Sequence, residues 1–165
     1  FVRAKGEIPE LSFDIYGKGG EEGKIRSLID DLAASEYIKL KGHADLAEVY
    51  KNYEIYLSAS TSEGFGLTLM EAIGSGLTII GFDVPYGNQT FVVEGKNGYL
   101  IPNSVDQVVD RIADAFSEKI VKIYRNHELE SMRQASYARA EDFLTIRVEE
   151  AWRQLIEEVT HVKSV

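Results

Sequence analysis

The chain has 165 residues, of which 44% are hydrophobic, and this composition suits one globular domain over residues 1–165 with its own core. Its 27 acidic residues outnumber its 18 basic ones, giving a net charge of −9. This balance argues against nucleic-acid binding, which requires clustered lysines and arginines. The absence of cysteine excludes disulfides and thiolate metal sites, and it is compatible with the cytoplasmic location that we expect.

Residues 1–5 resemble the last turn of a helix that begins upstream, with Gly6 as its stop signal. A Rossmann-like sheet normally starts with a strand before such a helix, and the sequence contains no candidate for that strand. The chain also opens on Phe1 rather than on methionine. We therefore expect a fragment of a longer protein.

Five short apolar runs predict β-strands. They cover Leu11–Tyr16, Ile38–Lys41, Ile55–Ser58, Leu77–Phe82 and Tyr99–Ile101. The third and fourth runs are apolar nearly throughout, which is typical of strands that are covered on both faces. Segments with helical spacing separate the runs, so the pattern predicts an α/β protein with right-handed crossovers and a Rossmann-like, doubly wound parallel sheet.

Three stripes at helical spacing mark the helices between these strands. The stripes comprise Ile25, Leu28, Ile29 and Leu32; Leu46, Val49 and Tyr50; and Leu67, Met70, Glu71 and Ile73. The third stripe follows Gly66 directly, so we expect its helix to begin there.

After Pro102 the pattern predicts a C-terminal helical tail. Ser104 is a good helix cap. The apolar positions of the helix that it would cap are Val105, Val108, Val109, Ile112, Ala115 and Phe116. Further helices are expected over Leu129–Arg139 and Thr145–Val159. The apolar face of the last one comprises Val148, Ala151, Trp152, Leu155 and Ile156. We expect this tail to pack back on the sheet.

The segment from Ser60 to Ala72 carries the strongest functional signal, because it follows a predicted buried strand and opens a helix. Ligands of doubly wound sheets bind at the carboxyl ends of the strands, where helix N-termini point at them. Gly64 and Gly66 allow a ligand to approach the backbone closely. The first-turn amides of the helix then add to the positive end of its dipole, which predicts an anion site suited to phosphate.

Glu63 and Glu71 flank this predicted anion site. A carboxylate repels phosphate, but it can accept two O–H donors from vicinal hydroxyls. A ribose on one side of a diphosphate and a hexose on the other would suit both acids, so the sequence points to a nucleotide-sugar site. The alternative is that Glu63 is a solvated acid complementing the helix dipole and Glu71 a surface residue.

Other binding signals are weaker. The stretch Gly17-Lys18-Gly19-Gly20 begins like a dinucleotide fingerprint, but the pattern fails at Glu22 and no acidic residue closes the next strand. No metal site is expected, because the histidines are dispersed and lack carboxylate or cysteine partners at ligand spacing. These histidines are His43, His127 and His161.

The motif Ser-Glu-Gly-Phe-Gly-Leu-x-Leu-x-Glu-Ala-x-x-x-Gly over residues 62–76 resembles the signature of the group 1, or family 4, retaining glycosyltransferases of GT-B fold. The resemblance continues through Gly76–Gly81 and Glu94–Pro102. It also includes Gly17–Gly19 and Leu40–His43, which follow the first two predicted strands. It therefore covers nearly the whole chain, with several motifs in the family's order and spacing.

The resemblance implies that the chain is the C-terminal, nucleotide-sugar-binding half of such an enzyme. Glu63 would hold hydroxyls of the donor hexose in the catalytic site without acting as a nucleophile, and Glu71 would hold the ribose diol. Phe65, Gly66, Leu67 and Thr68 would offer backbone groups to the sugar and the diphosphate, and Lys41 and His43 would line the base pocket. Gly64 and Gly17 complete the implied donor-binding positions. The resemblance implies a UDP-sugar substrate, no cofactor and no bound metal.

The loop over residues 86–91 resembles one in bacterial enzymes that place N-acetylglucosamine on serine-rich repeat adhesins, and related enzymes glucosylate teichoic acid. Tyr86 and Phe91 in this loop either contact a ligand or anchor the loop, and we favour anchoring. The family's acceptor-binding N-terminal domain is missing, as are an Arg and a Lys that neutralise the diphosphate. We therefore expect no sugar transfer by the chain alone.

Association with a membrane surface or a partner subunit would arise through the missing half. The alternative function is a non-catalytic sugar-nucleotide-binding or partner-docking domain. The presence of both Glu63 and Glu71 argues against that alternative, because a subunit without catalytic activity has no chemical need for the pair.

Overall fold

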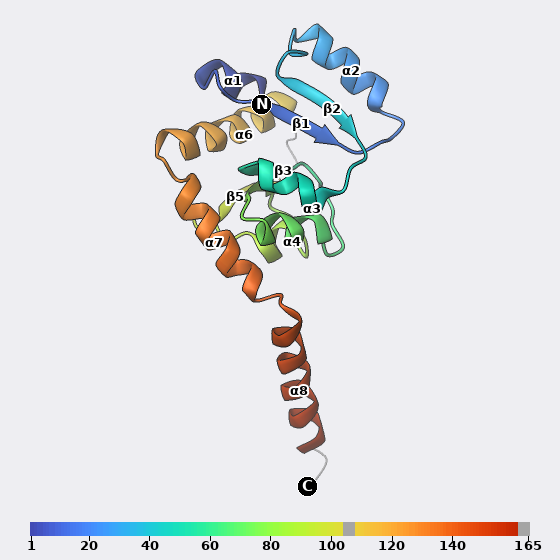
Figure 1. Cartoon of the computed structure of the whole chain (residues 1–165), viewed down its shortest axis with the longest axis vertical. Helices are drawn as coiled ribbons and strands as arrows, with labels where there is room; N and C mark the ends of the chain where they lie inside the picture. The colour runs from blue at the N-terminus through green and yellow to red at the C-terminus, as the bar shows by residue number, and fades with distance from the viewer. Residues whose placement is uncertain (104–107, 162–165) are drawn as a thin grey trace.

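Five strands form two separate parallel sheets in the computed structural model, which describes residues 1–103 and 108–161 (Figure 1). In the first sheet, β1 (Phe13–Tyr16) pairs with β2 (Ile38–Gly42). In the second, β3 (Ile55–Ser58), β4 (Thr78–Phe82) and β5 (Gly98–Ile101) follow one another in that order. The predicted α/β class and the Rossmann-like parallel sheet with flanking helices are confirmed, with the strands hydrogen-bonded in two groups.

Strand β4 is the buried centre of the second sheet, with all five residues buried. Its side chains alternate between two helical layers. Ile79 packs against Leu69 and Ile73 of α4 (Leu67–Gly74), while Ile80 and Phe82 belong to a cluster with α6 (Val109–Arg125). Helices therefore cover both faces of this sheet, as the apolar run predicted.

Strand β3 is less buried than its sequence predicts, and β1 is similarly accessible. All four residues of β1 are only half-buried, and in β3 only Ser58 is fully buried. Within the described part of the chain, each of these strands has a neighbouring strand along one edge only. The uncovered edges explain the difference, because an unpaired edge leaves part of each residue accessible.

Helix α1 (Val2–Glu7) joins the first sheet to the second by packing on α6. Ala4 and Ile8 lie in the same apolar cluster as Ile120, and Arg3 donates to Asp114 at 2.5 Å. Gly6 lies inside α1, so its prediction as a helix stop is wrong. Glycine weakens a helix only modestly, and the packing on α6 outweighs that cost.

The other helices near the sheets are short. They are α2 (Glu22–Asp31), α3 (Leu46–Val49) with a 3-10 turn at Tyr50–Asn52, and α5 (Asn88–Phe91). In α2 only Ile29 of the predicted stripe is buried, whereas Leu28 and Leu32 are about half exposed.

The start of the helical tail differs from its prediction. Helix α6 begins at Val109, and its N-cap residue Val108 makes no side-chain hydrogen bond. The predicted cap Ser104 and the neighbouring Val105 lie outside the described residues. Val108 and Val109 are exposed rather than buried, while Phe116 is in the core. The apolar face of α6 thus begins about one turn later than expected.

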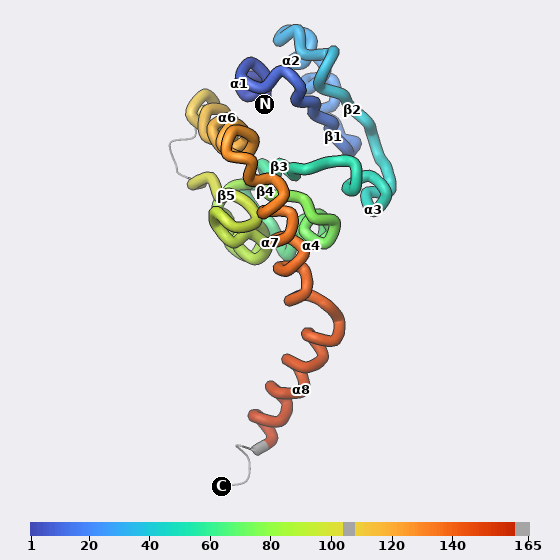
Figure 2. The backbone as a smooth tube through the Cα atoms, turned by 60° about the vertical axis from the view of Figure 1, so that its left-hand side comes forward, coloured from blue at the N-terminus to red at the C-terminus, as the bar shows by residue number. Residues whose placement is uncertain are grey.

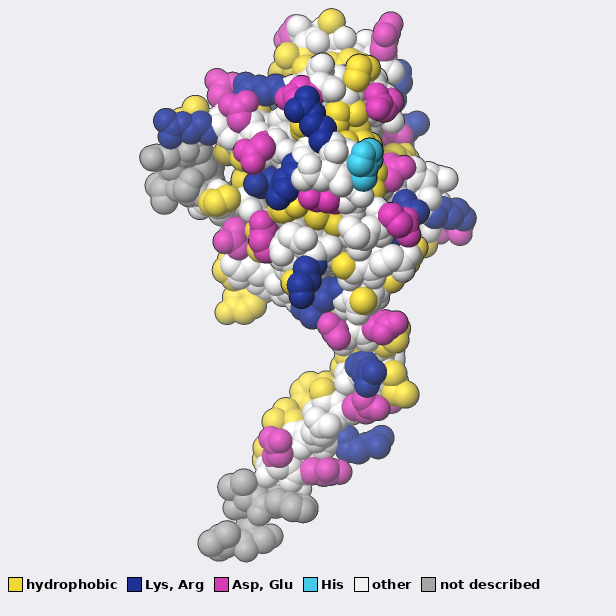
Figure 3. Space-filling model, turned by 90° about the vertical axis from the view of Figure 1, so that its left-hand side faces the viewer, with side chains coloured by type: hydrophobic (Ala, Val, Ile, Leu, Met, Phe, Trp, Pro, Cys, Tyr) yellow, Lys and Arg dark blue, Asp and Glu magenta, His cyan; other side chains and the backbone are white. Residues whose placement is uncertain are grey.

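Helix α7 (Leu129–Glu141) packs back on the second sheet as expected, but α8 (Thr145–His161) does not. In α7, Met132 is buried and the Ser136 hydroxyl donates to Leu77 O at 2.8 Å. Helix α8 projects away from the sheets and the other helices (Figures 1 and 2), and the side chain of its Trp152 is 61% exposed. Figure 3 shows hydrophobic side chains along this projecting helix. Among the described residues, no helix has the length and hydropathy of a membrane span.

Candidate functional site

The turn before α4 has the geometry that the sequence predicts for an anion site. Gly66 is the N-cap residue of α4 and has φ +81°, a left-handed conformation that favours glycine. A β-carbon at this position would lie 2.7 Å from Leu69 Cδ1, so a larger residue would also clash. The backbone can therefore turn tightly from the carboxyl end of β3 into the helix.

The first amides of α4 precede its internal hydrogen bonds. The amides of Leu69 and Met70 donate to Gly66 O at 2.9 and 3.2 Å. The amides of Leu67 and Thr68 come before these first hydrogen bonds, so they have no acceptor within the helix. The side chains of Phe65 and Leu67 are 48% and 61% exposed. An accessible helix N-terminus of this kind attracts a phosphate group through its dipole and its free N–H donors.

Two tyrosines hold the first turn of α4 in place. The Tyr50 hydroxyl donates to Thr68 O and the Tyr56 hydroxyl donates to Thr68 Oγ1, each at 3.2 Å. Burial raises the pKa of Tyr50, and the nearby Tyr56 and Glu71 raise it further. Tyr50 therefore remains a protonated donor, and Glu71 lies close enough to act on it electrostatically.

Glu63 is half-buried beside the loop between β4 and α5. A β-carbon at Gly87 would lie 2.4 Å from Glu63 Cβ, so only a glycine allows this loop to contact Glu63 so closely. Glu71, in contrast, is exposed on the second turn of α4. The two acids therefore differ in setting, since one is fixed against a loop and the other faces solvent.

We expect Gly87→Ala to destabilise the protein by about 2 kcal/mol, because overpacking of this kind typically costs 1–3 kcal/mol. The added methyl group must push Glu63 or the loop away, which should also shift the amide resonance of Glu63. Urea unfolding followed by NMR spectroscopy measures both effects. Gly64→Ala is the matched control, since a β-carbon there meets no atom within 4 Å. Equal unfolding midpoints for the two variants would contradict the expected contact.

The second group of predicted site residues lies at the carboxyl ends of β1 and β2. Gly17 has φ +136° and its amide donates to Gly42 O at 2.7 Å, which ties the two loops together. Lys41 forms an ion pair with Asp14 at 3.4 Å, while His43 is exposed. The ion pair between Lys41 and Asp14 was not predicted, because Asp14 belongs to a strand and carries no motif.

Among the described residues, no hydrogen bond or ion pair joins the α4 group to the group at β1 and β2. The cavity between β1 and β3 is lined by Thr68 but by none of the other predicted site residues. It is therefore a different feature from the turn before α4. The assignment of individual donor contacts stays a prediction.

Of the two aromatic residues predicted to anchor the loop after β4, only one does so. Phe91 is fully buried and packs edge-on against Phe65 at a centroid distance of 5.3 Å, so it anchors the loop. Tyr86 is 77% exposed with φ +62°, so the expectation that it also anchors the loop is wrong. The pair Tyr86-Gly87 could have been singled out as a turn signal, since glycine marks close backbone approach.

No group of three or more metal-ligating side chains lies together anywhere in the described ranges.

Comparisons with known proteins identify the family to which the chain is similar. The family of glycosyl transferases group 1 matches residues 1–139. The UDP-N-acetylglucosamine--peptide N-acetylglucosaminyltransferase GtfA subunit of Streptococcus pneumoniae is 58% identical over 160 residues, which cover 97% of this chain and 32% of that protein. The chain thus spans about a third of the length of the curated relatives that it matches most fully.

Solved structures of glycosyltransferases are similar to this chain in fold as well. The crystal structure of the pneumococcal O-GlcNAc transferase GtfA in complex with UDP and GlcNAc is similar with a TM-score of 0.88 and 58% identity, over 97% of this chain and 32% of that one. A crystal structure of S. aureus TarM has a TM-score of 0.78 and 27% identity, over 93% of this chain and 30% of that one. By sequence and by fold, the chain belongs to the group 1 glycosyltransferases.

Proposed function

We propose that the chain is the donor-binding part of a retaining glycosyltransferase that transfers a hexose from a UDP-sugar to a hydroxyl group of a protein or a cell-wall polymer. N-acetylglucosamine or glucose is the proposed hexose. The observation that carries the proposal is the left-handed turn at Gly66, which opens α4 between Glu63 and Glu71. The relatives support the choice of donor, since one is named as a UDP-N-acetylglucosamine transferase and its structure holds UDP and GlcNAc.

The proposed roles follow from the charge on the donor. The amides of Leu67 and Thr68 and the α4 dipole would stabilise the diphosphate. Glu71 would accept hydrogen bonds from the ribose diol, and Glu63 would accept them from hydroxyls of the hexose. We propose that neither a metal nor a cofactor takes part, with further cationic groups for the leaving UDP supplied by the rest of the protein.

Titration calorimetry on the 165-residue chain, with EDTA present throughout, tests the donor assignment. UDP, UDP-glucose and UDP-N-acetylglucosamine should each bind at least about tenfold more tightly than GDP-mannose, a difference of about 1.4 kcal/mol. Sugar transfer by this chain alone should be undetectable, because the leaving diphosphate lacks part of its stabilisation. Equal binding of all four ligands would overturn the donor assignment, and turnover by the chain alone would overturn the division of roles.

The second candidate is a non-catalytic domain that docks a partner subunit. The exposed apolar side chains of α8 favour it, since apolar patches often mark interaction surfaces. A relative solved as a GtfA/B complex also supports association with a partner. Sugar transfer by the full-length protein would support the enzyme, whereas donor binding without transfer, with or without a partner subunit, would support the docking domain.

A further inference from the structure

Helix α7 contacts both α4 and the segment over residues 84–91, here called the α5 segment. The Tyr137 hydroxyl donates to Ser75 O at 3.3 Å, at the C-terminal end of α4. Nearer the end of α7, Arg139 Nη2 donates to Thr90 O. Arg139 therefore connects α7 to the segment that contacts Glu63.

Arg139 is held in one position by several groups at once. Its Nη1 donates to Asp142 Oδ2 at 2.6 Å, and its guanidinium lies 5.0 Å from the ring centroid of Phe143. Its Nε is buried and has no hydrogen-bond partner among the described residues. Because an unpaired buried donor costs free energy, stability alone does not account for an arginine here. The forked guanidinium can, however, bind Thr90 O and Asp142 at the same time.

The α5 segment is held against Glu63 at both of its ends. At its start, the fully buried Asn88 donates from Nδ2 to the backbone oxygen of the last residue of β4 at 2.8 Å. Near its end, Thr90 O accepts from Arg139, while the amide of Thr90 donates to Gly87 O at 2.9 Å. Gly87 is the residue whose β-carbon would lie 2.4 Å from Glu63 Cβ. A single hydrogen bond within the segment thus separates the acceptor of Arg139 from the residue that contacts Glu63.

A row of aromatic rings connects Arg139 to the turn before α4 by a second route. Beyond Phe143, which lies under the guanidinium, the ring of Phe91 follows at a centroid distance of 4.9 Å and that of Phe65 at a further 5.3 Å. Phe91 is fully buried. Close-packed rings leave little room for one to move without the next. Release of Arg139 should therefore loosen the loop on the hexose side of the turn.

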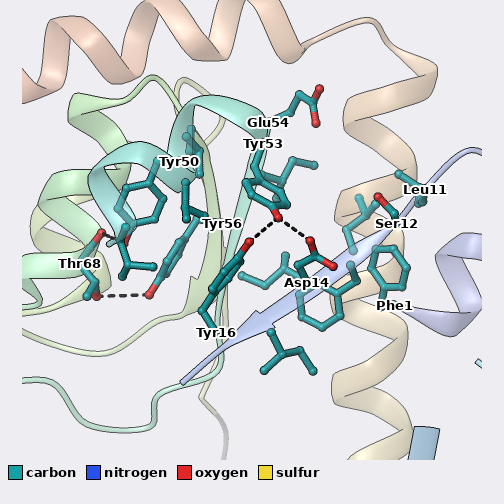
Figure 4. Close-up of a pocket in the computed structure, with 18 of the residues that line it drawn as sticks. Phe1, Leu11, Ser12, Asp14, Tyr16, Tyr50, Tyr53, Glu54, Tyr56 and Thr68 are labelled. Atoms are coloured by element: carbon teal, nitrogen blue, oxygen red, sulfur yellow. Dashed lines mark hydrogen bonds between the residues drawn. The ribbon is translucent and has the colours of Figure 1, made fainter. Parts of the chain in front are cut away.

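The amides on the diphosphate side of the turn have a different support. Tyr50 and Tyr56 hydrogen-bond to Thr68 from the 3-10 turn and from β3 (Figure 4). Among the described residues, no hydrogen bond or ion pair joins either tyrosine to Arg139. The first turn of α4 and Glu63 are thus positioned through separate sets of contacts.

We propose that Arg139 is a positioning residue for Glu63. It holds the α5 segment against Glu63, so that the carboxylate stays where it accepts hydrogen bonds from the donor hexose. This role rests on the proposed function, since Glu63 has that task only when a UDP-sugar is bound. A displacement of about 1 Å in a reacting geometry costs up to about 10²-fold in rate. Loosening the segment should therefore lower turnover and leave the affinity for UDP unchanged, because UDP carries no hexose.

Arg139→Met in the full-length protein tests the role. Methionine keeps the aliphatic packing against Phe143 and removes the donor to Thr90 O. The kcat for release of UDP from UDP-N-acetylglucosamine or UDP-glucose, with water as the acceptor, should fall by about tenfold or more. The Kd of UDP, measured by calorimetry, should stay within about twofold. Arg139→Lys keeps the charge and a donor, so its kcat should lie between those of the original protein and Arg139→Met.

Two control variants separate positioning from a general loosening of α7. Tyr137→Phe removes the hydrogen bond to Ser75 O, which is a contact of α7 with the other end of α4. Asp142→Asn removes the charge that pairs with Arg139 and leaves the donation to Thr90 O in place. Both variants should keep kcat within about twofold of the original value. If Arg139→Met does not fold, Arg139→Gln takes its place with the same expectation, because its amide is too short to reach Thr90 O.

Hydrogen exchange followed by mass spectrometry reports on the α5 segment directly. A peptide covering residues 84–91 should exchange faster in Arg139→Met than in Tyr137→Phe. An unchanged kcat in Arg139→Met, an equal loss in Tyr137→Phe, or a loss of UDP affinity as large as the loss of kcat would overturn the role. If the original protein neither binds UDP nor releases it from the sugar, the proposed function fails and the role fails with it. A failure of the role alone leaves UDP binding by the original protein intact.

Discussion

Replacing Glu71 by alanine in the full-length protein is expected to weaken the binding of UDP and of UDP-N-acetylglucosamine equally, by roughly 30-fold. Hydrogen bonds to a charged group contribute about 1.5–3 kcal/mol, and roughly 30-fold corresponds to about 2 kcal/mol. The effect should be the same for both ligands because both carry the ribose. Glu71 is exposed on α4, and its carboxylate makes no hydrogen bond or ion pair with the other described residues, so its removal should leave the fold intact.

Glu63→Ala should impair the reaction of the UDP-sugar without weakening the binding of UDP. UDP carries no hexose, so its binding should change little, whereas the turnover of UDP-N-acetylglucosamine should fall more than it does for Glu71→Ala. Calorimetry with UDP, followed by steady-state kinetics with the UDP-sugar, separates the two acids. Gly87 fixes the position of Glu63 from the neighbouring loop, so the loss should appear in turnover as well as in affinity for the sugar.

Glu36→Ala is a suitable control for both variants, because Glu36 is an exposed acid just before the amino end of β2, whereas the predicted site lies at the carboxyl ends of the strands. It tests whether the loss of one negative charge alone alters the binding of an anionic donor. Negligible effects of both Glu63→Ala and Glu71→Ala would remove these acids from the site. Identical profiles for the two would contradict their separate roles.

Gly98→Ala should be the most damaging single substitution for stability. A β-carbon at Gly98 would lie 2.0 Å from Ile79 O, a backbone atom of the central strand β4 that no change of rotamer can move. The methyl group must therefore separate β5 from β4, where Ile79 and Gly98 are paired. We expect a loss of about 3 kcal/mol in the free energy of unfolding, at the upper end of the usual range for overpacking. Urea unfolding of the chain measures it.

Gly74→Ala provides the comparison for this substitution. Gly74 is the last residue of α4, and a β-carbon there meets no atom within 4 Å. Because alanine favours the helix over glycine by up to about 1 kcal/mol, Gly74→Ala should leave the stability unchanged or raise it slightly. A Gly98→Ala variant as stable as the original chain would show that β4 and β5 are not paired as described.

The parts of the fold that the sequence predicted well are those that depend on local pattern. The run Ile55–Ser58 is a strand with the predicted bounds, and Gly66 caps α4 in the left-handed conformation that its place in the motif implied. Such features follow from side-chain alternation and from the steric freedom of glycine, which neighbouring residues alone determine. Membership of the family followed from the same motif and is confirmed over residues 1–139.

The parts that could not be predicted depend on what lies next to an element in space. The apolar face of α8 predicted a packed helix, yet Trp152 is exposed because the turn after α7 directs the helix away from the sheets. Lys41 was expected near the donor base, but its ion pair with Asp14 required the register of β1 and β2. The sequence predicted that the first helix stops at Gly6, but α1 extends to Glu7 because it packs on α6.

The unit formed by β1, α2 and β2 has its own small apolar cluster, which includes Ile29, Ala34 and Ile38. It is attached to the rest of the chain through α1 and through side-chain bridges such as Tyr53 to Asp14, and no backbone ladder between β1 and β3 is present in the described part of the chain. Cooperativity of unfolding comes from shared packing and shared ladders. This unit should therefore melt first and independently, so that denaturation of the 165-residue chain proceeds in two steps rather than one.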